Sequence, residues 1–245
     1  MPVMIELLGV GAPHEDGGWR LHRVCASFRR GEVTLVVSHL PEERDALLDA
    51  VAARIVPEEG RVWVDRVPVS RDTARRIRGL VAEVDVHARA VAHRSLLWNV
   101  LVSGKSGQRT IQGLLRLPRK TEREAARRAL ERVGLGGREI ELAAALGTVD
   151  LARLAVAGAL VRKPEALAVR EVDAGFDEAE AAAVRGLLQS LARRERLAVL
   201  ASAASPAAAR GFADRLVAIA DGLLVFDGQP ADFSDERAAW RFGIA

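Results

Sequence analysis

The feature that most constrains the fold is an alternation of short apolar runs with segments of helical periodicity. The run Val33–Val37 is almost wholly apolar, which is typical of a strand buried on both faces of a sheet. A loop follows it, and Pro41 with two acidic residues then suits the first turn of a helix. Apolar runs at 166–169 and 197–202 are separated by a helical segment at 178–193. This order predicts an α/β protein.

A segment in the middle of this alternation has a different sequence pattern. Residues 88–137 are mostly helical in pattern, with glycine-rich breaks, and are interpreted as a helical insertion. We therefore expect an α/β core at 1–86 and 146–245, and a helical insertion subdomain at 87–145. The remaining expectations are β-like runs at 3–10 and 21–28, two short strands within 57–69, a helix at 72–80, a strand at 80–86, a helix at 121–133, a helix through 206–213 and a hairpin at 215–228.

Composition narrows the class of protein. The 36 Lys and Arg residues are nearly matched by 33 Asp and Glu, so that the net charge is only +3 and no nucleic-acid partner is expected. No apolar run reaches the ~20 residues needed to cross a bilayer, and the first residues lack the pattern of a signal peptide, so a cytoplasmic protein is expected. Cys25 is the single cysteine, which excludes an internal disulfide; we expect it to be packed in a strand.

Several segments together resemble the ATP-binding subunits of ABC transporters. They are GEVTLVV with its loop and helix, PEEGRVWVDRVPV, PEALAVREVDAGFD and ADRLVAIADGLLVFDGQPADF. The segments LLWNVLVSGKSGQRTIQGLLRL and FDGQPADFSDERAAW are similar to corresponding parts of phosphonate-type importer ATPases. The resemblance covers nearly the whole chain. It implies a P-loop NTPase-type core with a mixed β-sheet, an antiparallel β subdomain and a helical insertion.

The same resemblance implies partners and a location. Such subunits work at the inner face of the cell membrane, bound to a membrane permease and paired as a homodimer or as a heterodimer with another ABC ATPase subunit. ATP and Mg²⁺ would be their cofactors. Each motif that carries chemistry in the family departs from its pattern in this chain.

The phosphate loop departs furthest. An active loop has the pattern G-x-x-x-x-G-K-[ST], in which backbone N–H groups close on phosphate, the lysine meets its oxygens and the hydroxyl holds Mg²⁺. Here Ser38 and Glu43 stand at the two glycine positions, Arg44 at the lysine and Asp45 at the hydroxyl, followed by Ala46. Pro41 also lacks a backbone donor. We therefore expect ATP binding to be weak or absent and Mg²⁺ to be disfavoured, with an ordinary helix start as the plainer interpretation.

A second stretch that looks like a phosphate motif is Gly104, Lys105 and Ser106. No strand leads directly into it, and Asn99 stands where the first glycine would be. It is interpreted as a loop of the insertion.

The family's apolar metal strand ends in Asp-Glu, but here 166–169 is followed by Arg170 and Glu171. Arg170 reverses the charge of the metal-binding aspartate, and we predict that it pairs with Asp45 or, failing that, with Glu43. Glu171 keeps the catalytic-glutamate position, where a residual carboxylate held by its neighbours is expected. Asp177 matches the loop that crosses the family's dimer interface and can also cap the helix at 178–193. No metal site is predicted.

The family's signature segment, which contacts the γ-phosphate of the partner subunit's nucleotide, corresponds to residues 146–150. Gly147 and Thr148 keep a small and a hydroxyl residue, whereas Val149 and Asp150 do not suit an anion clamp. The switch histidine is replaced by Ala204, and the family's glutamine falls near Val86. His14 falls near the adenine position, although a solvated loop histidine explains it as well.

Three functions remain open at this level. The first is a degenerate, pseudo-ATPase subunit that docks to a permease and hydrolyses little or no ATP. The second is a stand-alone scaffold or regulatory pseudoenzyme. The third is an active ABC ATPase with an atypical site that uses Arg44 and Glu171.

Overall fold

The computed structural model describes residues 2–14, 17–103 and 118–233. Within them a six-stranded sheet has the order β10-β9-β3-β8-β7-β6. Strands β9, β3, β8, β7 and β6 run parallel, and β10 pairs antiparallel with β9, so that the sheet is mixed as expected. Its strands are β3 (Val33–Val37), β6 (Val81–Asp85), β7 (Ala166–Arg170), β8 (Ala198–Ala203), β9 (Arg215–Ala220) and β10 (Leu223–Gly228).

A second, antiparallel sheet has four strands in the order β2-β1-β4-β5. Gly60 lies where β4 crosses beside β1, with a φ of +72°, and a Cβ there would lie 2.2 Å from the carbonyl oxygen of Gly9. This close approach therefore requires glycine. The strands are β1 (Val3–Pro13), β2 (Trp19–Arg29), β4 (Glu59–Val64) and β5 (Val67–Pro68).

The helices begin where the sequence predicted for α1 and α7. Pro41 occupies the first turn of α1, and Asp177 caps α7. The expected helix through 206–213 is wrong: only a short 3₁₀ turn forms at Pro206–Ala209, and Gly211 follows with a φ of +65°. The helices of the described chain are α1 (Pro41–Val51), α2 (Ala74–Leu80), α3 (Leu96–Ser103), α5 (Lys120–Arg132), α6 (Thr148–Leu160) and α7 (Glu178–Glu195).

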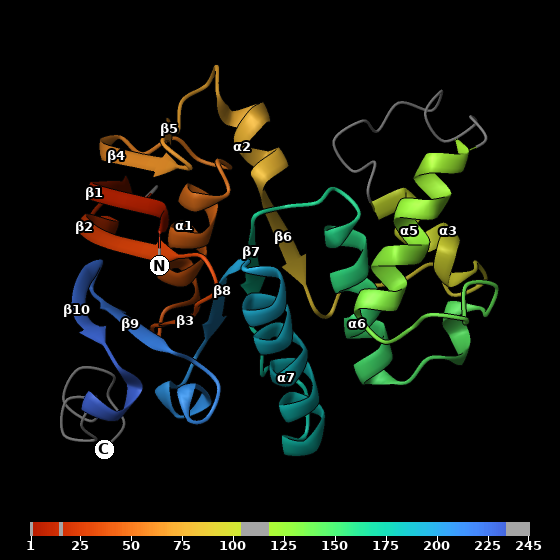
Figure 1. The fold of residues 1–245 in the computed structure, drawn as a ribbon. Helices are drawn as coiled ribbons and strands as arrows, with labels where there is room; N and C mark the ends of the chain where they lie inside the picture. Colours follow the sequence, from red (N-terminus) through yellow and green to blue (C-terminus); the bar gives the residue numbers. More distant parts are fainter. Residues whose placement is uncertain (1, 15–16, 104–117, 234–245) are drawn as a thin grey trace.

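Two hydrophobic cores lie on opposite faces of the six-stranded sheet. Along β3, Leu35 belongs to one core and Val36 to the other, as the alternation of side chains in a strand requires. The first core continues into α3, α5, α6 and α7, and the second into α1 and the antiparallel sheet. Figure 1 shows the antiparallel strands on one side of the molecule, α3, α5 and α6 on the other, and β7, β8 and α7 between them.

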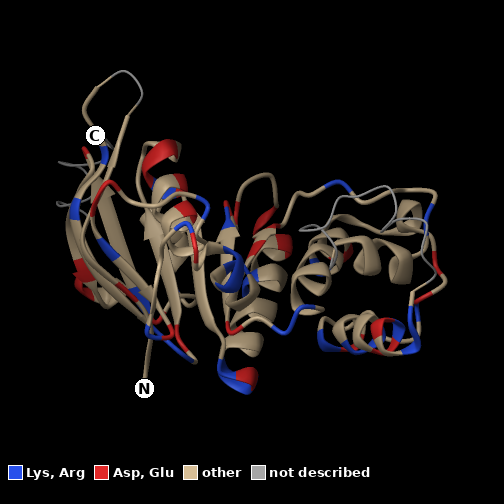
Figure 2. Cartoon of the chain, turned by 90° about the horizontal axis from the view of Figure 1, so that it is seen from above, with Lys and Arg blue, Asp and Glu red and all other residues tan. Residues whose placement is uncertain are grey.

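Charged residues are spread over most of the molecule. Figure 2 shows basic and acidic positions distributed over most elements, in keeping with the small net charge of +3. Cys25 corrects one expectation, because it lies in β2 but is exposed: its neighbours in the strand, Val24 and Ala26, point into the core. Within the described residues, no helix combines the length and apolarity that crossing a bilayer needs.

Candidate functional site

The candidate site surrounds the loop that joins β3 to α1. This loop, residues 38–40, leaves the carboxyl end of a central parallel strand. The carboxyl ends of β7 and β8 bring Arg170 and Ser202 to the same edge of the sheet. Ligands of open α/β sheets bind at such edges.

Glu43 is a buried carboxylate in the first turn of α1. Only 1% of it is exposed, and its Oε1 accepts a hydrogen bond of 2.6 Å from the backbone N–H of Gly222. The hydroxyl of Ser38 donates to Oε2 of Glu43 and itself accepts from the N–H of Leu40 at 3.0 Å. A carboxylate in the first turn also lies at the positive end of the helix dipole. The chain thus holds a buried carboxylate at a residue that the resemblance assigns to a phosphate-loop glycine.

Arg44 is equally buried, with 3% of the residue exposed. Its Nη1 donates to the carbonyl oxygen of Ser38, and its Nη2 donates to Oε1 of Glu171 at 2.9 Å. Glu171 has a φ of 45°, and its backbone N–H donates to Oγ of Ser202 at 2.9 Å. The carboxylate expected to be held by its neighbours is therefore paired with the arginine at the lysine position.

Arg170 lies among three carboxylates. Its Nη1 pairs with Asp45, and its Nη2 lies 2.6 Å from Oδ1 of Asp49 and 3.3 Å from Oε1 of Glu83. Burial alone would lower the pKa of the Arg170 guanidinium, but Asp45 and Asp49 outweigh it, and the pKa is raised. The predicted contact between Arg170 and Asp45 is present, and the fallback partner Glu43 is engaged by Ser38 and Gly222 instead.

These residues, as arranged, do not fit a magnesium triphosphate. Mg²⁺ demands near-octahedral oxygen ligands at about 2.0–2.1 Å, whereas a guanidinium holds the carboxylates of Asp45, Asp49 and Glu83. Pro41 offers no N–H to a phosphate, and Glu43 adds a negative charge to the first turn of α1. Over the residues that the structure describes, no group of three or more His, Cys, Asp and Glu side chains is arranged to hold a metal ion.

The segment at the signature position lies at the start of α6. Gly147 is the residue before the helix and Thr148 its first residue. Asp150 accepts from Arg138 at 2.6 Å and from Arg153 at 3.0 Å. Arg138 also binds Glu141, and these hydrogen bonds lower the pKa of the Glu141 carboxyl. Asp150 therefore belongs to an ion-pair network, while an anion-binding role of Gly147 and Thr148 stays a prediction.

Asp177 forms a capping box at the start of α7. Its Oδ1 accepts from the N–H of Glu180 at 2.8 Å, and its own N–H donates to Oε2 of Glu180 at 3.2 Å. Its place at a dimer interface stays a prediction. Nearby, burial raises the pKa of the Asp173 carboxyl, with Glu171 adding to the effect and Arg185 and Arg44 opposing it.

Sequence reasoning missed four participants in the site. Asp49 could have been found, because it lies one helical turn after Asp45 and on the same face of α1. Glu83, Ser202 and Gly222 reach the site through sheet order and the β9–β10 turn, and no local pattern marks them. The expected decoy at Gly104–Ser106 lies outside the described residues.

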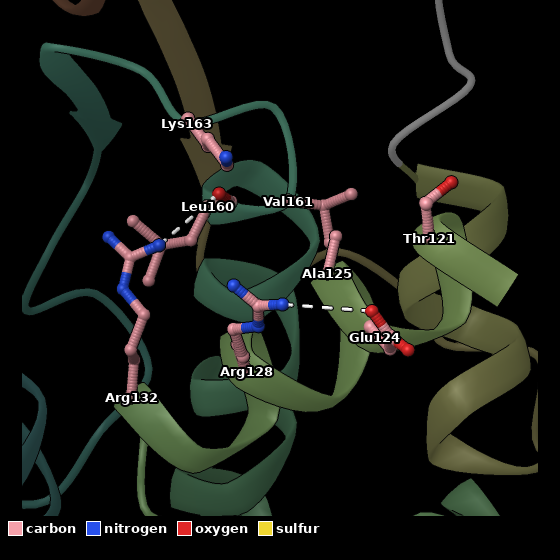
Figure 3. A pocket seen from close by; sticks show the side chains of 8 residues that line it. All are labelled: Thr121, Glu124, Ala125, Arg128, Arg132, Leu160, Val161 and Lys163. Atoms are coloured by element: carbon pink, nitrogen blue, oxygen red, sulfur yellow. Dashed lines mark hydrogen bonds and ion pairs between the residues drawn. The ribbon is translucent and has the colours of Figure 1, made fainter.

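A separate pocket of about 330 Å³ lies between α5 and the end of α6 (Figure 3). Arg128, Arg132 and Lys163 line it together with apolar Leu160 and Val161. None of its described lining residues belongs to the β3–α1 loop or to β7. It is therefore distinct from the candidate site.

Comparison with known proteins supplies the family. The chain is 30% identical over 234 residues to a phosphite import ATP-binding protein, PxtA, of Stutzerimonas stutzeri, covering 95% of this chain and 84% of that protein. It is 28% identical to a phosphonates import ATP-binding protein, PhnC 2, of Cupriavidus metallidurans, covering 96% and 85%. No family model matches the chain.

Solved structures agree on the fold. The structure superposes with a TM-score of 0.82 on cbiO1 of Clostridium perfringens, part of an ABC transporter complex, at 19% identity, covering 100% of this chain and 97% of that one. A second ATP-binding cassette, solved in its ADP conformation, gives a TM-score of 0.82 at 16% identity over 94% and 92% of the two chains. The α/β architecture is thus that of the ABC ATPase cassettes. Sequence and fold together place the chain in the family of ABC-transporter ATP-binding proteins that includes the phosphonate and phosphite import subunits.

Proposed function

We propose that this chain is a pseudo-ATPase subunit of an ABC importer of the phosphonate type, which docks to a membrane permease and hydrolyses little or no ATP. The proposal rests above all on Glu43, a buried carboxylate at a glycine position of the family's phosphate loop, which accepts the hydrogen bonds of Gly222 and Ser38. The carboxylates around Arg170 support it from the metal side. The subunit would lie at the cytoplasmic face of the membrane, paired with itself or with another ABC ATPase subunit.

The electrostatic penalty for a triphosphate is large enough to matter. Two like charges about 4 Å apart repel by about 4 kcal/mol at an effective dielectric of ~20. Such a penalty weakens binding about a thousandfold. A nucleotide would also have to compete with Glu43 for the Gly222 N–H. Arg44 offsets little of this, because its guanidinium is already shared between Ser38 and Glu171.

The alternative hypothesis, an active ATPase with an atypical site, requires Glu171 to act as the catalytic carboxylate. Its carboxylate would have to leave Arg44, 2.9 Å away, before it could orient or deprotonate a water. It would also have to act without the aspartate that the family places at position 170. These two requirements favour the pseudo-ATPase over the atypical enzyme.

Calorimetric titration of the purified chain with Mg-ATP tests the proposal. We expect no saturable heat in the micromolar range and no phosphate release above background. A variant with Ser38→Gly, Glu43→Gly, Arg44→Lys, Asp45→Ser and Arg170→Asp restores the family's residues at these five positions. It is the positive control, because it should bind Mg-ATP more tightly than the unaltered chain if these residues are what prevents binding. Micromolar affinity of the unaltered chain, with turnover abolished by Glu171→Gln, would establish the active enzyme instead.

The permease partnership needs its own experiment. Coexpression of the tagged chain with a membrane permease of the phosphonate-import type should yield a membrane complex that survives detergent extraction. A chain that purifies alone from such membranes would favour the stand-alone scaffold. Light scattering of the purified chain, alone and mixed with a second ATP-binding subunit, distinguishes a homodimer from a heterodimer.

A further inference from the structure

We propose that the pocket between α5 and the end of α6 binds a small organic acid, whose carboxylate pairs with Arg128 and Lys163 and whose apolar part lies against Leu160 and Val161. The pocket shares no lining residue with the β3–α1 loop or with β7, so the inference goes beyond the proposed function and does not depend on it. Whether the chain hydrolyses ATP has no bearing on it.

One face of α5 forms a wall of the pocket (Figure 3). The lining residues of this helix recur at intervals of three and four, which places them on one side of it, while Ala126, Ala129 and Leu130 turn to the core. The other wall comes from the end of α6, where Leu160 is 1% exposed and Val161 is half-buried. The lining residues of α5 are Thr121, Glu124, Ala125, Arg128 and Arg132.

The charges around the pocket do not balance. Arg128, Arg132 and Lys163 line it, and Glu124 is the one carboxylate among the described lining residues. Arg132 is engaged in a bidentate pair with Glu195, which lies outside the lining. Three cations thus face two carboxylates. One positive charge remains, which a monoanion would balance.

Two of these cations are available to a ligand. Nη2 of Arg128 lies 3.7 Å from Oε2 of Glu124, which is too long for a hydrogen bond, and the Arg128 side chain is 70% exposed. The ammonium of Lys163 forms no ion pair within the described ranges. Lys163 follows α6 in the left-handed conformation, with a φ of 52°, and its N–H donates to the carbonyl oxygen of Leu160 at 2.9 Å. Figure 3 shows the charged ends of Arg128, Arg132 and Lys163 on the side of the pocket where Leu160 lies.

A different role for these cations is to stabilise the carbonyl end of α6, because basic residues favour helix C-termini. Arg132 has this role, since its Nη1 lies 3.4 Å from the carbonyl oxygen of Leu160. Among the described residues, the side chains of Arg128 and Lys163 donate to no carbonyl oxygen of α6. They therefore remain for a ligand.

The size and chemistry of the pocket select the ligand. A volume of about 330 Å³ lies at the lower end of the roughly 300–1,000 Å³ of ligand pockets. A guanidinium binds a planar carboxylate through two parallel hydrogen bonds. Apolar Leu160 and Val161, with the methyl group of Ala125, suit a ring or a short branched chain. These properties favour a small monocarboxylic acid.

Calorimetric titration of the full chain with benzoate and with isovalerate, at matched ionic strength, tests the inference. We expect saturable binding of one or both. Neutral benzamide should bind at least about tenfold more weakly than benzoate, because it forms no ion pair. Acetate keeps the carboxylate but lacks the apolar part, and should also bind more weakly. If neither acid binds saturably, or if benzamide binds as well as benzoate, the inference is wrong.

Variants locate the binding in the pocket. Arg128→Ala and Lys163→Ala should each weaken the binding of the acid at least about fivefold, whereas Arg127→Ala, exposed on the same helix but outside the lining, should leave it unchanged. Ala125→Leu keeps every charge and should weaken binding by filling the pocket. In a nuclear magnetic resonance titration, the backbone amides of α5 and of residues 160–163 should shift. If Arg128→Ala and Lys163→Ala bind the acid like the unaltered chain, or if other amides shift instead, the pocket is not an organic-acid site.

Discussion

At the scale of single residues, Glu43 places a buried carboxylate at a helix N-terminus. The dipole and free N–H groups of such a terminus attract an anion from outside the protein. In this chain the anion is built into the third residue of α1, and it is held by Gly222 from the β9–β10 turn. The two oxygens of this carboxylate accept from Gly222 and Ser38, and no described side chain caps the N–H groups at the start of α1.

The first prediction concerns this residue. Glu43→Ala should lower the free energy of unfolding by about 2–3 kcal/mol, because the Gly222 N–H and the Ser38 hydroxyl lose their acceptor inside the protein. Urea denaturation measures the change. Glu42→Ala removes a neighbouring carboxylate in the same turn and should cost less than about 0.5 kcal/mol. If both variants lowered the free energy of unfolding equally, the buried hydrogen bonds of Glu43 would add no stability.

The second prediction concerns the pH dependence of Asp173. Burial raises the pKa of its carboxyl in the folded state, so the folded protein holds the proton more tightly than the unfolded chain does. Its contribution to stability is therefore fully present below the unfolded pKa of about 3.9 and is lost as the pH rises through the folded pKa. Asp173→Asn should gain stability relative to the unaltered protein as the pH rises from 4 to 7.

Denaturation in urea at several pH values measures this difference. Asp72→Asn, at an exposed position, controls for the loss of a carboxylate. A difference between Asp173→Asn and the unaltered protein that stays constant over this pH range would contradict the prediction.

The sequence pointed to Glu43, Arg44, Arg170 and Glu171 as candidate site residues, but it predicted only part of what they contact. The contact of Arg170 with Asp45 follows from charge at two positions that the fold brings together. The contact of Arg44 with Glu171 and that of Glu43 with Gly222 depend on side-chain direction and on the placement of a distant turn. Periodicity and propensity contain no information on either.

At the scale of elements, α5 is tied to α7 by a bidentate ion pair at the ends of both helices. Nε of Arg132 donates to Glu195 at 2.8 Å, Nη2 contacts the other carboxylate oxygen, and Nη1 lies 3.4 Å from the carbonyl oxygen of Leu160. The insertion thus has a polar contact with the core in addition to its apolar one.

The third prediction concerns this pair. A double-mutant cycle with Arg132→Ala and Glu195→Ala should give a coupling energy of about 0.5–1 kcal/mol, because both side chains are more than a quarter exposed. The coupling should fall when the salt concentration is raised to ~1 M. A coupling that is unchanged by salt would mean that the two variants interact through packing and not through charge.

Most elements could be predicted from periodicity, because buried strands and amphipathic helices leave clear patterns. The exception is 206–213, where alanines suggested a helix. Ser205 caps a single turn by accepting from the Ala207 N–H, and Gly211 with its positive φ ends the turn before buried Phe212. Cys25 was misplaced for a related reason: the side of a strand that faces the core is decided by its register with the neighbouring strand.

At the scale of the whole molecule, the six-stranded sheet separates two cores, and the helical insertion shares one of them. Leu130 of α5 is fully buried in the same cluster as Leu35 of β3 and Leu188 of α7. The division at 87 and 145 remains a proposal about subdomains. The shared core implies that the insertion does not fold alone.

The fourth prediction follows from this shared core. Leu130→Ala should destabilise the whole molecule by about 2–5 kcal/mol and lower a single thermal transition, rather than releasing the insertion first. Scanning calorimetry measures this through the ratio of the calorimetric to the van't Hoff enthalpy. The exposed substitution Arg127→Ala in the same helix should leave the transition unchanged. A second, lower transition that appears only in Leu130→Ala would show that the insertion unfolds independently.

The contacts of Glu43 and Arg170 also bear on which single substitutions this chain can accept. Glycine at position 43 alone would leave the Gly222 N–H and the Ser38 hydroxyl without their acceptor. Aspartate at position 170 alone would gather four carboxylates beside the mostly exposed guanidinium of Arg54. Each of these substitutions is therefore expected to destabilise the protein when it is made alone. Substitutions toward the family's motifs should therefore be tolerated only when they are made together.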